Sequence, residues 1–199
     1  MKKELAYFNI EGEYGGNQNW FYDPMMRLGG CAAIATCDLC IYLNLYSGNK
    51  HLYPFNIDSL QKKDYIKFSK IMKKYLHPRV KGINTLQLYI DGFSSYLYDI
   101  NDEEIKMEPF SGENSVYDGE KIVVGQIEKE IPIPFLLLKH KNKKLNELVW
   151  HWFLIVGYEK TEDDLLVKIA TYGKYNWISF KNLWDTGYDE KGGMIIIIT

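Results

Sequence analysis

The chain has 199 residues, of which 46% are hydrophobic and 15% aromatic, with 24 Lys and Arg, 26 Asp and Glu and a formal net charge of -2. A chain of this length buries roughly 70% of its unfolded surface, so we expect one domain over 1–199. The lysines are dispersed and form no basic stripe, which excludes a typical nucleic acid partner.

The beginning of the chain, MKKELAYFNIEGEYGG, lacks an apolar core of signal-peptide length, and no run approaches the roughly 18 apolar residues of a membrane span. We therefore expect a cytoplasmic protein with no membrane partner. Three cysteines cannot form a complete disulfide framework. The histidines and cysteines show no metal-ligand spacing, so we expect no metal and no cofactor. The oligomeric state is not indicated.

Helical patterns dominate the first part of the chain. Residues 31–46, CAAIATCDLCIYLNLY, are apolar nearly all round, which predicts a buried central helix. Cys37 and Cys40 lie inside this helix, where a C-x-x-C pair is interpreted as packing and not as a zinc or redox site. Three more helices are expected, over about 58–75 with Asp58-Ser59 as its cap, over about 84–98, and from a cap at Asp118 to about 129.

From residue 131 the pattern changes to short apolar or alternating runs separated by polar turns. These runs predict five strands, over 131–140, 150–158, 165–172, 175–180 and 194–199. Helices followed by antiparallel strands indicate an α+β fold, with a helical part over about 1–130 and a sheet part over about 131–199.

Two residues in these elements suggest nucleophilic chemistry. Cys31 follows Gly29-Gly30 at the start of the central helix, where the backbone is free to turn sharply and a substrate can approach closely. The helix start and a nearby histidinium would lower the thiol pKa, so that the thiolate predominates at neutral pH. His151 opens a strand that is apolar on both faces, where a histidine is costly to bury unless its nitrogens find partners.

An oxyanion intermediate needs two donors. The backbone N–H of Cys31 is one candidate, and Gln18 in GGNQNWF is the other, although Asn17 or Asn19 are alternatives for that position.

With these residues in place, the chain resembles a known family. Gln18, GGCAAIA around Cys31 and HWFLIVGY from His151, followed by VKIATYGKYNWISF, look like the papain-like cysteine peptidases, particularly their bacterial C39-like branch. The resemblance implies a papain-like fold, whose helical lobe has a central helix starting at the nucleophile and whose other lobe is an antiparallel sheet. It also implies Cys31 as nucleophile, His151 as general base and acid, and Gln18 as oxyanion donor, acting on a peptide or small peptide-like amide.

One position departs from the family pattern. The family has Asn or Asp on the strand after the histidine strand, where it holds the imidazole in its productive tautomer. Here that stretch reads Ala170-Thr171-Tyr172-Gly173, so Thr171 is the nearest candidate for the orienting residue. Its hydroxyl can accept a ring N–H but carries no charge.

Three alternatives to a cysteine peptidase remain at this point. A thiol acyltransferase or deamidase would use the same residues. A catalytically degenerate binding module would fit the missing Asn or Asp. In the third alternative Cys31 and His151 never meet and are only core residues. Asp38, two helical turns after Cys31, is interpreted as a polar group bonded to backbone or to a tyrosine beneath the site.

Overall fold

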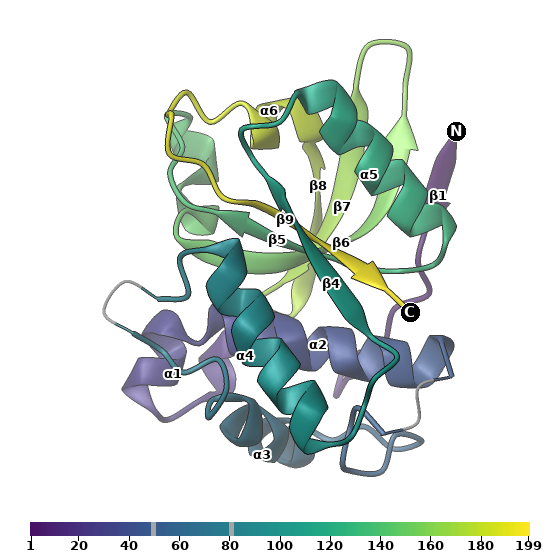
Figure 1. The fold of residues 1–199 in the computed structure, drawn as a ribbon, viewed down its shortest axis with the longest axis vertical. Coiled ribbons are helices and arrows are strands. Elements are labelled where there is room, and N and C mark those ends of the chain that lie inside the picture. Colours follow the sequence, from purple (N-terminus) through teal and green to yellow (C-terminus); the bar gives the residue numbers. More distant parts are fainter. Residues whose placement is uncertain (49–50, 80–81) are drawn as a thin grey trace.

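The computed structural model describes residues 1–48, 51–79 and 82–199. It shows a mixed fold of helices and antiparallel sheet, which confirms the α+β class (Figure 1). The helices are α1 (Pro24–Gly29), α2 (Cys31–Tyr46), α3 (Lys62–Met72), α4 (Leu86–Asp99), α5 (Val116–Glu128) and α6 (Phe180–Trp184), with 3-10 helices η1 (Gln18–Trp20) and η2 (Lys143–Leu148).

The strands are β1 (Lys2–Glu4), β2 (Asn9–Ile10), β3 (Glu13–Tyr14), β4 (Lys106–Ser111), β5 (Ile133–Leu137), β6 (His151–Lys160), β7 (Leu165–Thr171), β8 (Lys174–Ser179) and β9 (Gly193–Ile198). Six strands of the main sheet follow the order β4-β9-β5-β6-β7-β8, and β1 pairs with the second half of β6. Strands β2 and β3 form a separate hairpin.

Strand β6 is the centre of this sheet. It pairs with β5 and β1 on one side and with β7 on the other, and residues 151–158 are all buried. This explains why its sequence is apolar on both faces. Because the strand begins at His151, the histidine lies at one end of the most central element.

Helix α2 contacts β6 and β5 and is buried over most of its length. Its apolar residues surround the helix instead of forming one stripe, as expected for a helix enclosed by the sheet, α1 and α3. In Figure 1, α2 lies below the sheet with α3 beneath it, while α5 and α6 lie over the upper part of the sheet.

The division into a helical part and a sheet part is less strict than the sequence suggested. Strands β1 and β4 both belong to the main sheet, although they lie within residues 1–130. Strand β4, KMEPFS, has no continuous apolar run, and all six of its residues are exposed or half-buried along the outer edge of the sheet. It is therefore recognisable only by its antiparallel pairing with β9.

The expected cap at Asp58-Ser59 is wrong. Helix α3 begins at Lys62, whose backbone N–H donates to the Glu11 carboxylate at 3.1 Å, so a distant residue replaces a local cap. Helix α5 begins at Val116 after Ser115, whose hydroxyl accepts from the Asp118 backbone N–H. Asp118 therefore lies in the first turn and is not the cap.

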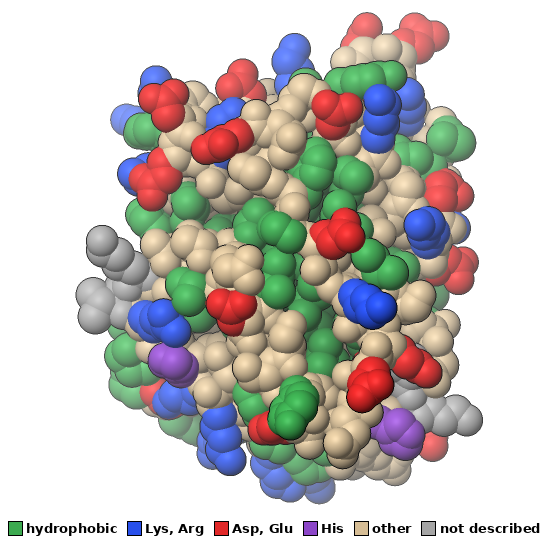
Figure 2. Space-filling view, viewed as in Figure 1, with side chains coloured by type: hydrophobic (Ala, Val, Ile, Leu, Met, Phe, Trp, Pro, Cys, Tyr) green, Lys and Arg blue, Asp and Glu red, His purple; other side chains and the backbone are tan. Residues whose placement is uncertain are grey.

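Acidic and basic side chains lie interspersed over the face shown in Figure 2, with hydrophobic side chains reaching the surface between them. Within the three described segments, no helix combines the length and the apolar character needed to cross a membrane.

Candidate functional site

Cys31 is the first residue of α2 and lies directly after a tight junction between two helices. Helix α1 ends at Gly29, and Gly30 is both its C-cap and the N-cap of α2. A Cβ atom on Gly30 would lie 2.5 Å from the carbonyl oxygen of Met26, so only glycine fits this junction. The junction places the Cys31 sulfur at a helix N-terminus, where backbone N–H groups have no acceptor within the helix.

His151 is almost fully buried at the start of β6, with a polar partner near each ring nitrogen. Its Nε2 lies 2.7 Å from the Thr171 hydroxyl, and its Nδ1 lies 3.4 Å from the Tyr172 hydroxyl. Thr171 ends β7, the strand next to β6, and Tyr172 follows it in the turn. The structure therefore places Thr171 beside His151, at the position where the sequence suggested an orienting residue.

Gln18 is the buried member of the Asn17-Gln18-Asn19 group. Its Nε2 donates to the Arg27 carbonyl at 2.8 Å, which fixes the plane of the amide and leaves one N–H free to point elsewhere. Its buried Oε1 has no hydrogen-bond partner within the described ranges. Asn17 instead caps the following turn by accepting from Asn19 N–H, and Asn19 is exposed.

A small cavity brings the candidate residues together. Gln18, Cys31, His151 and Thr171 all line it, and its volume of about 10 Å³ suits roughly one water molecule. The sulfur also lies against the backbone N–H of Trp152, the residue after His151. Residues 120 positions apart in the chain thus line one cavity, where α2 begins and β6 begins.

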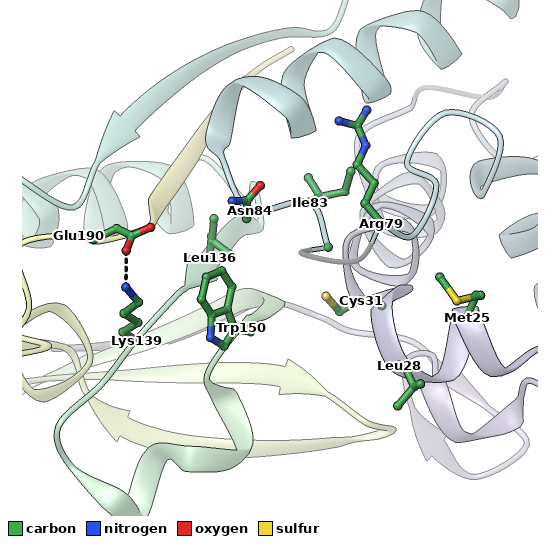
Figure 3. Close-up of a pocket in the computed structure, with 12 residues that line it drawn as sticks. Met25, Leu28, Cys31, Arg79, Ile83, Asn84, Leu136, Lys139, Trp150 and Glu190 are labelled. Atoms are coloured by element: carbon green, nitrogen blue, oxygen red, sulfur yellow. Dashed lines mark hydrogen bonds and ion pairs between the residues drawn. The ribbon is translucent and has the colours of Figure 1, made fainter.

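Cys31 also lines a larger groove of about 750 Å³. Figure 3 shows the sulfur pointing into this groove, with Leu136 and Trp150 on the sheet side and Met25 and Leu28 of α1 on the other. Trp150, Met25 and Leu28 are 45%, 46% and 84% exposed, so the groove offers apolar surface to solvent. Cys31 is therefore the point where the open groove meets the small inner cavity.

Of the ionisable side chains that line the cavity, the Cys31 thiol and the His151 imidazole rest in their neutral forms. Burial raises the pKa of the Cys31 thiol, and the backbone N–H groups of Trp152 and Ala32 oppose this with a smaller effect. Burial lowers the pKa of His151 to about 4. The sequence-based expectation of a thiolate that predominates at neutral pH is therefore wrong for the free protein, because desolvation disfavours both charged forms.

Asp38 also lines the cavity and ties several segments to α2. It accepts hydrogen bonds from the Tyr65 hydroxyl at 2.7 Å, the Tyr7 hydroxyl at 3.0 Å and the Gly16 backbone N–H at 3.1 Å. Burial raises its pKa to about 6, although these donors pull it down. This matches the interpretation of Asp38 as a polar group bonded to backbone and tyrosine.

Two residues of the site were not singled out from the sequence as functional. Tyr172 stacks on the imidazole of His151, and Gly16 lines the cavity beside Gln18. A signal for Tyr172 was present, since Tyr172-Gly173 separates two strand patterns at the distance of a two-residue hairpin turn. Nothing local in the sequence marks which way its ring turns.

Across the described segments, no group of three or more His, Cys, Asp or Glu side chains is arranged to hold a metal ion. All three cysteines are free and buried, and Cys37 and Cys40 lie inside α2. The fold and the site together define an α+β protein with a buried thiol, imidazole and carboxamide around one cavity. In comparisons by sequence, no family model and no curated protein matches this chain.

Proposed function

We propose that the protein is a papain-like thiol hydrolase of the C39-like kind, which cleaves a peptide or peptide-like amide through a thioester on Cys31. The observation that carries this proposal is the shared cavity of Gln18, Cys31, His151 and Thr171 at the inner end of an open groove. A nucleophile, a base, an orienting group and an amide donor are the parts that acyl transfer needs.

The reaction begins from the neutral pair. With Thr171 accepting the Nε2 proton, Nδ1 of His151 is the basic nitrogen, and it takes the thiol proton as Cys31 Sγ attacks the carbonyl carbon. The backbone N–H of Cys31 and the free N–H of Gln18 stabilise the oxyanion. The imidazolium then protonates the leaving amine, and the C–N bond breaks to leave the thioester, which water hydrolyses.

A neutral resting pair is compatible with this chemistry. An imidazole with a pKa of about 4 is unprotonated at pH 7 and is therefore available as a base. The ion pair of thiolate and imidazolium contains the same number of protons as the neutral pair, so its population does not change with pH between the two pKa values. This gives the proposal a characteristic pH dependence.

Alkylation by iodoacetamide, quantified for each cysteine by peptide mass spectrometry, tests the proposal. We expect the Cys31 rate to form a plateau from about pH 5 to pH 8, with at most a small step near pH 6 where Asp38 ionises in the same cavity. At pH 6 it should exceed the rates of Cys37 and Cys40 by about 100-fold. His151→Ala removes the base, so the plateau should become a slope of about tenfold per pH unit. His151→Gln, which keeps most of the side-chain volume, should give the same slope.

Cys37 and Cys40 act as internal controls, because both are fully buried and become reactive only if α2 loses its packing. If Cys31 in the unchanged protein already follows a tenfold slope, or if neither His151 variant alters its rate, the thiol and imidazole do not act together and the proposal fails.

A binding module is the second candidate function, and one observation favours it: Thr171 stands where the family has a carboxamide or carboxylate. Turnover distinguishes the two candidates. An enzyme should release the amine from a mixture of fluorogenic peptide amides and lose this release in Cys31→Ser, whereas a module would show the alkylation plateau without release. A transferase or deamidase would differ only in its product.

The cysteines also support a location. All three are buried and unpaired, as is common in a reducing compartment, and this supports the proposal that the protein is cytoplasmic.

A further inference from the structure

The Tyr172-Gly173 turn has an unusual residue at its first position. Thr171 pairs with Lys174, so Tyr172 and Gly173 alone connect β7 to β8, with φ angles of +53° and +71°. A two-residue turn with both φ angles positive normally has Asn, Asp or Gly at its first position. A bulky tyrosine there is strained, and such strain persists only where surrounding contacts hold the residue in place.

Backbone hydrogen bonds from Gly173 N–H to the Gly16 carbonyl and from Tyr14 N–H to the Gly173 carbonyl hold the turn, and His151 contacts the Tyr172 side chain. The rings of Tyr172 and His151 stack with centroids 4.6 Å apart and planes only 4° from parallel. Because the planes are parallel and the rings overlap, the Tyr172 hydroxyl approaches Nδ1 at 3.4 Å from above the imidazole plane. The Tyr172 ring therefore does not occupy the in-plane direction of Nδ1, where a proton is gained.

Two neighbouring residues at this turn therefore contact the imidazole in different ways. Thr171 contacts Nε2 in a hydrogen bond of 2.7 Å, and Tyr172 covers one face of the ring. The negative face of an aromatic ring attracts a cation that lies over it. A neutral imidazole gains little from this attraction, but the imidazolium formed during attack gains from it.

We propose that Tyr172 is a positioning residue that fixes the orientation of the His151 ring and stabilises its imidazolium form, because position 171 carries a threonine and not a charged or amide partner. The inference rests on the proposed function. In the step concerned, the proton leaves Cys31 Sγ for His151 Nδ1, and the bonding electrons stay on the sulfur. The Tyr172 hydroxyl keeps its own proton throughout, since burial raises the pKa of Tyr172 to about 12.

The comparison of Tyr172→Phe with Tyr172→Leu tests this role. Both variants keep a large apolar side chain over the imidazole and the same backbone strain, but only phenylalanine keeps an aromatic face. We expect Tyr172→Leu to lower the Cys31 alkylation plateau by about threefold to thirtyfold, and Tyr172→Phe to lose at most about threefold. Tyr98→Leu, at a tyrosine 82% exposed on α4, is the control.

The acid limb of the pH profile is the range below about pH 5 in which the Cys31 alkylation rate falls. General structural damage would not change the pH at which this fall occurs, so the acid limb is a second measurement. Since the ring stabilises the imidazolium, Tyr172→Leu should displace the fall in rate below about pH 5 to still lower pH, in step with the lower plateau. Faster labelling of Cys37 and Cys40 would reveal a loosened core. In that case the Cys31 rates are corrected for the fraction of folded protein. The pH at which the corrected rate falls on the acid side then decides whether the ring stabilises the imidazolium.

Equal plateaus and equal acid limbs in Tyr172→Phe and Tyr172→Leu would overturn the role of the aromatic face. This result is distinguishable from a failure of the proposed function, because the unchanged protein would still show a plateau that depends on His151.

Discussion

At the scale of single residues, His151 and Asp38 respond to pH in opposite directions. His151 has a pKa lowered from 6.5 to about 4, so its contribution to the unfolding free energy falls by about 3 kcal/mol as pH falls from 6.5 to 4. Asp38 has a pKa raised from 3.8 to about 6, so its contribution to the unfolding free energy falls by about 3 kcal/mol as pH rises from 3.8 to 6. The two contributions largely cancel in the unchanged protein.

The Asp38→Asn variant separates the contribution of Asp38 from that of His151. The variant cannot ionise at this position. The unfolding free energy of the variant minus that of the unchanged protein should therefore increase by about 3 kcal/mol as pH rises from 4 to 6.5. Urea unfolding followed by tryptophan fluorescence at several pH values measures this difference. Asp163→Asn, at an exposed aspartate, should show no such trend. A difference between Asp38→Asn and the unchanged protein that stays constant with pH would contradict the assignment.

Two of the five non-glycine residues with positive φ angles in the described part of the chain lie at the site. Trp150 and Tyr172 have φ angles of +56° and +53°, and they directly precede His151 and follow Thr171. Such conformations cost on the order of 1–3 kcal/mol each for residues other than glycine. Trp150 lines the groove and Tyr172 covers the imidazole, so the strain is found where side chains must be held in particular directions.

At the scale of elements, the segment that carries Gln18 is held between α2 and the turn after β7. The Gly16 N–H donates to Asp38, and the Gly16 carbonyl accepts from Gly173 N–H at 3.0 Å. A Cβ atom on Gly16 would lie 1.9 Å from the Tyr65 hydroxyl oxygen. Gly16 therefore allows the segment to pass close to Tyr65 of α3, whose hydroxyl donates to Asp38 of α2, and this brings Gln18 to the cavity.

Gly16→Ala should displace this segment. We expect a loss of about 2 kcal/mol or more in unfolding free energy, together with a Cys31 alkylation plateau lowered by about tenfold. Gly125→Ala is the matched control, because a Cβ atom there meets nothing within 4 Å in helix α5. It should raise the unfolding free energy by about 0.5–1 kcal/mol and leave the plateau unchanged. Equal behaviour of the two variants would refute the close-approach argument.

At the scale of the whole molecule, the groove lies between the helices at the start of the chain and the central sheet. Its apolar walls come from α1 on one side and from β5 and the residue before β6 on the other, and its charged Lys139 and Glu190 form an ion pair with each other (Figure 3). A substrate with a large apolar group beside the scissile amide would bury this exposed surface.

Leu28→Asp tests whether the groove receives substrate. Leu28 is 84% exposed, so the change should alter the unfolding free energy by less than about 0.5 kcal/mol. It should slow inactivation of Cys31 by a leucine-containing peptidyl chloromethyl ketone by about tenfold, while the iodoacetamide rate stays the same. Tyr98→Asp, at an equally exposed residue outside the groove, should change neither rate. Parallel changes with both reagents would exclude the groove as the substrate path.

Much of the fold could be predicted because it depends on local pattern. The apolar run of 31–46 forms α2 with the predicted bounds, and all five predicted strands are present. Strand β4 and the start of α3 could not be predicted, since one depends on pairing with β9 and the other on the distant Glu11 carboxylate. Candidate residues could be chosen from helix and strand starts, but their grouping around one cavity required the chain to fold.

By itself, the sequence determined that this protein has a helix beginning at Cys31 that is apolar nearly all round, a central strand beginning at His151, and no carboxamide or carboxylate directly before Tyr172-Gly173. These properties follow from side-chain pattern and backbone freedom, which act over a few residues. Only the tertiary structure decided that Thr171 and Tyr172 hold the imidazole and that thiol and imidazole rest uncharged. Desolvation and ring stacking depend on which distant residues surround a group, and that is set only when the whole chain packs.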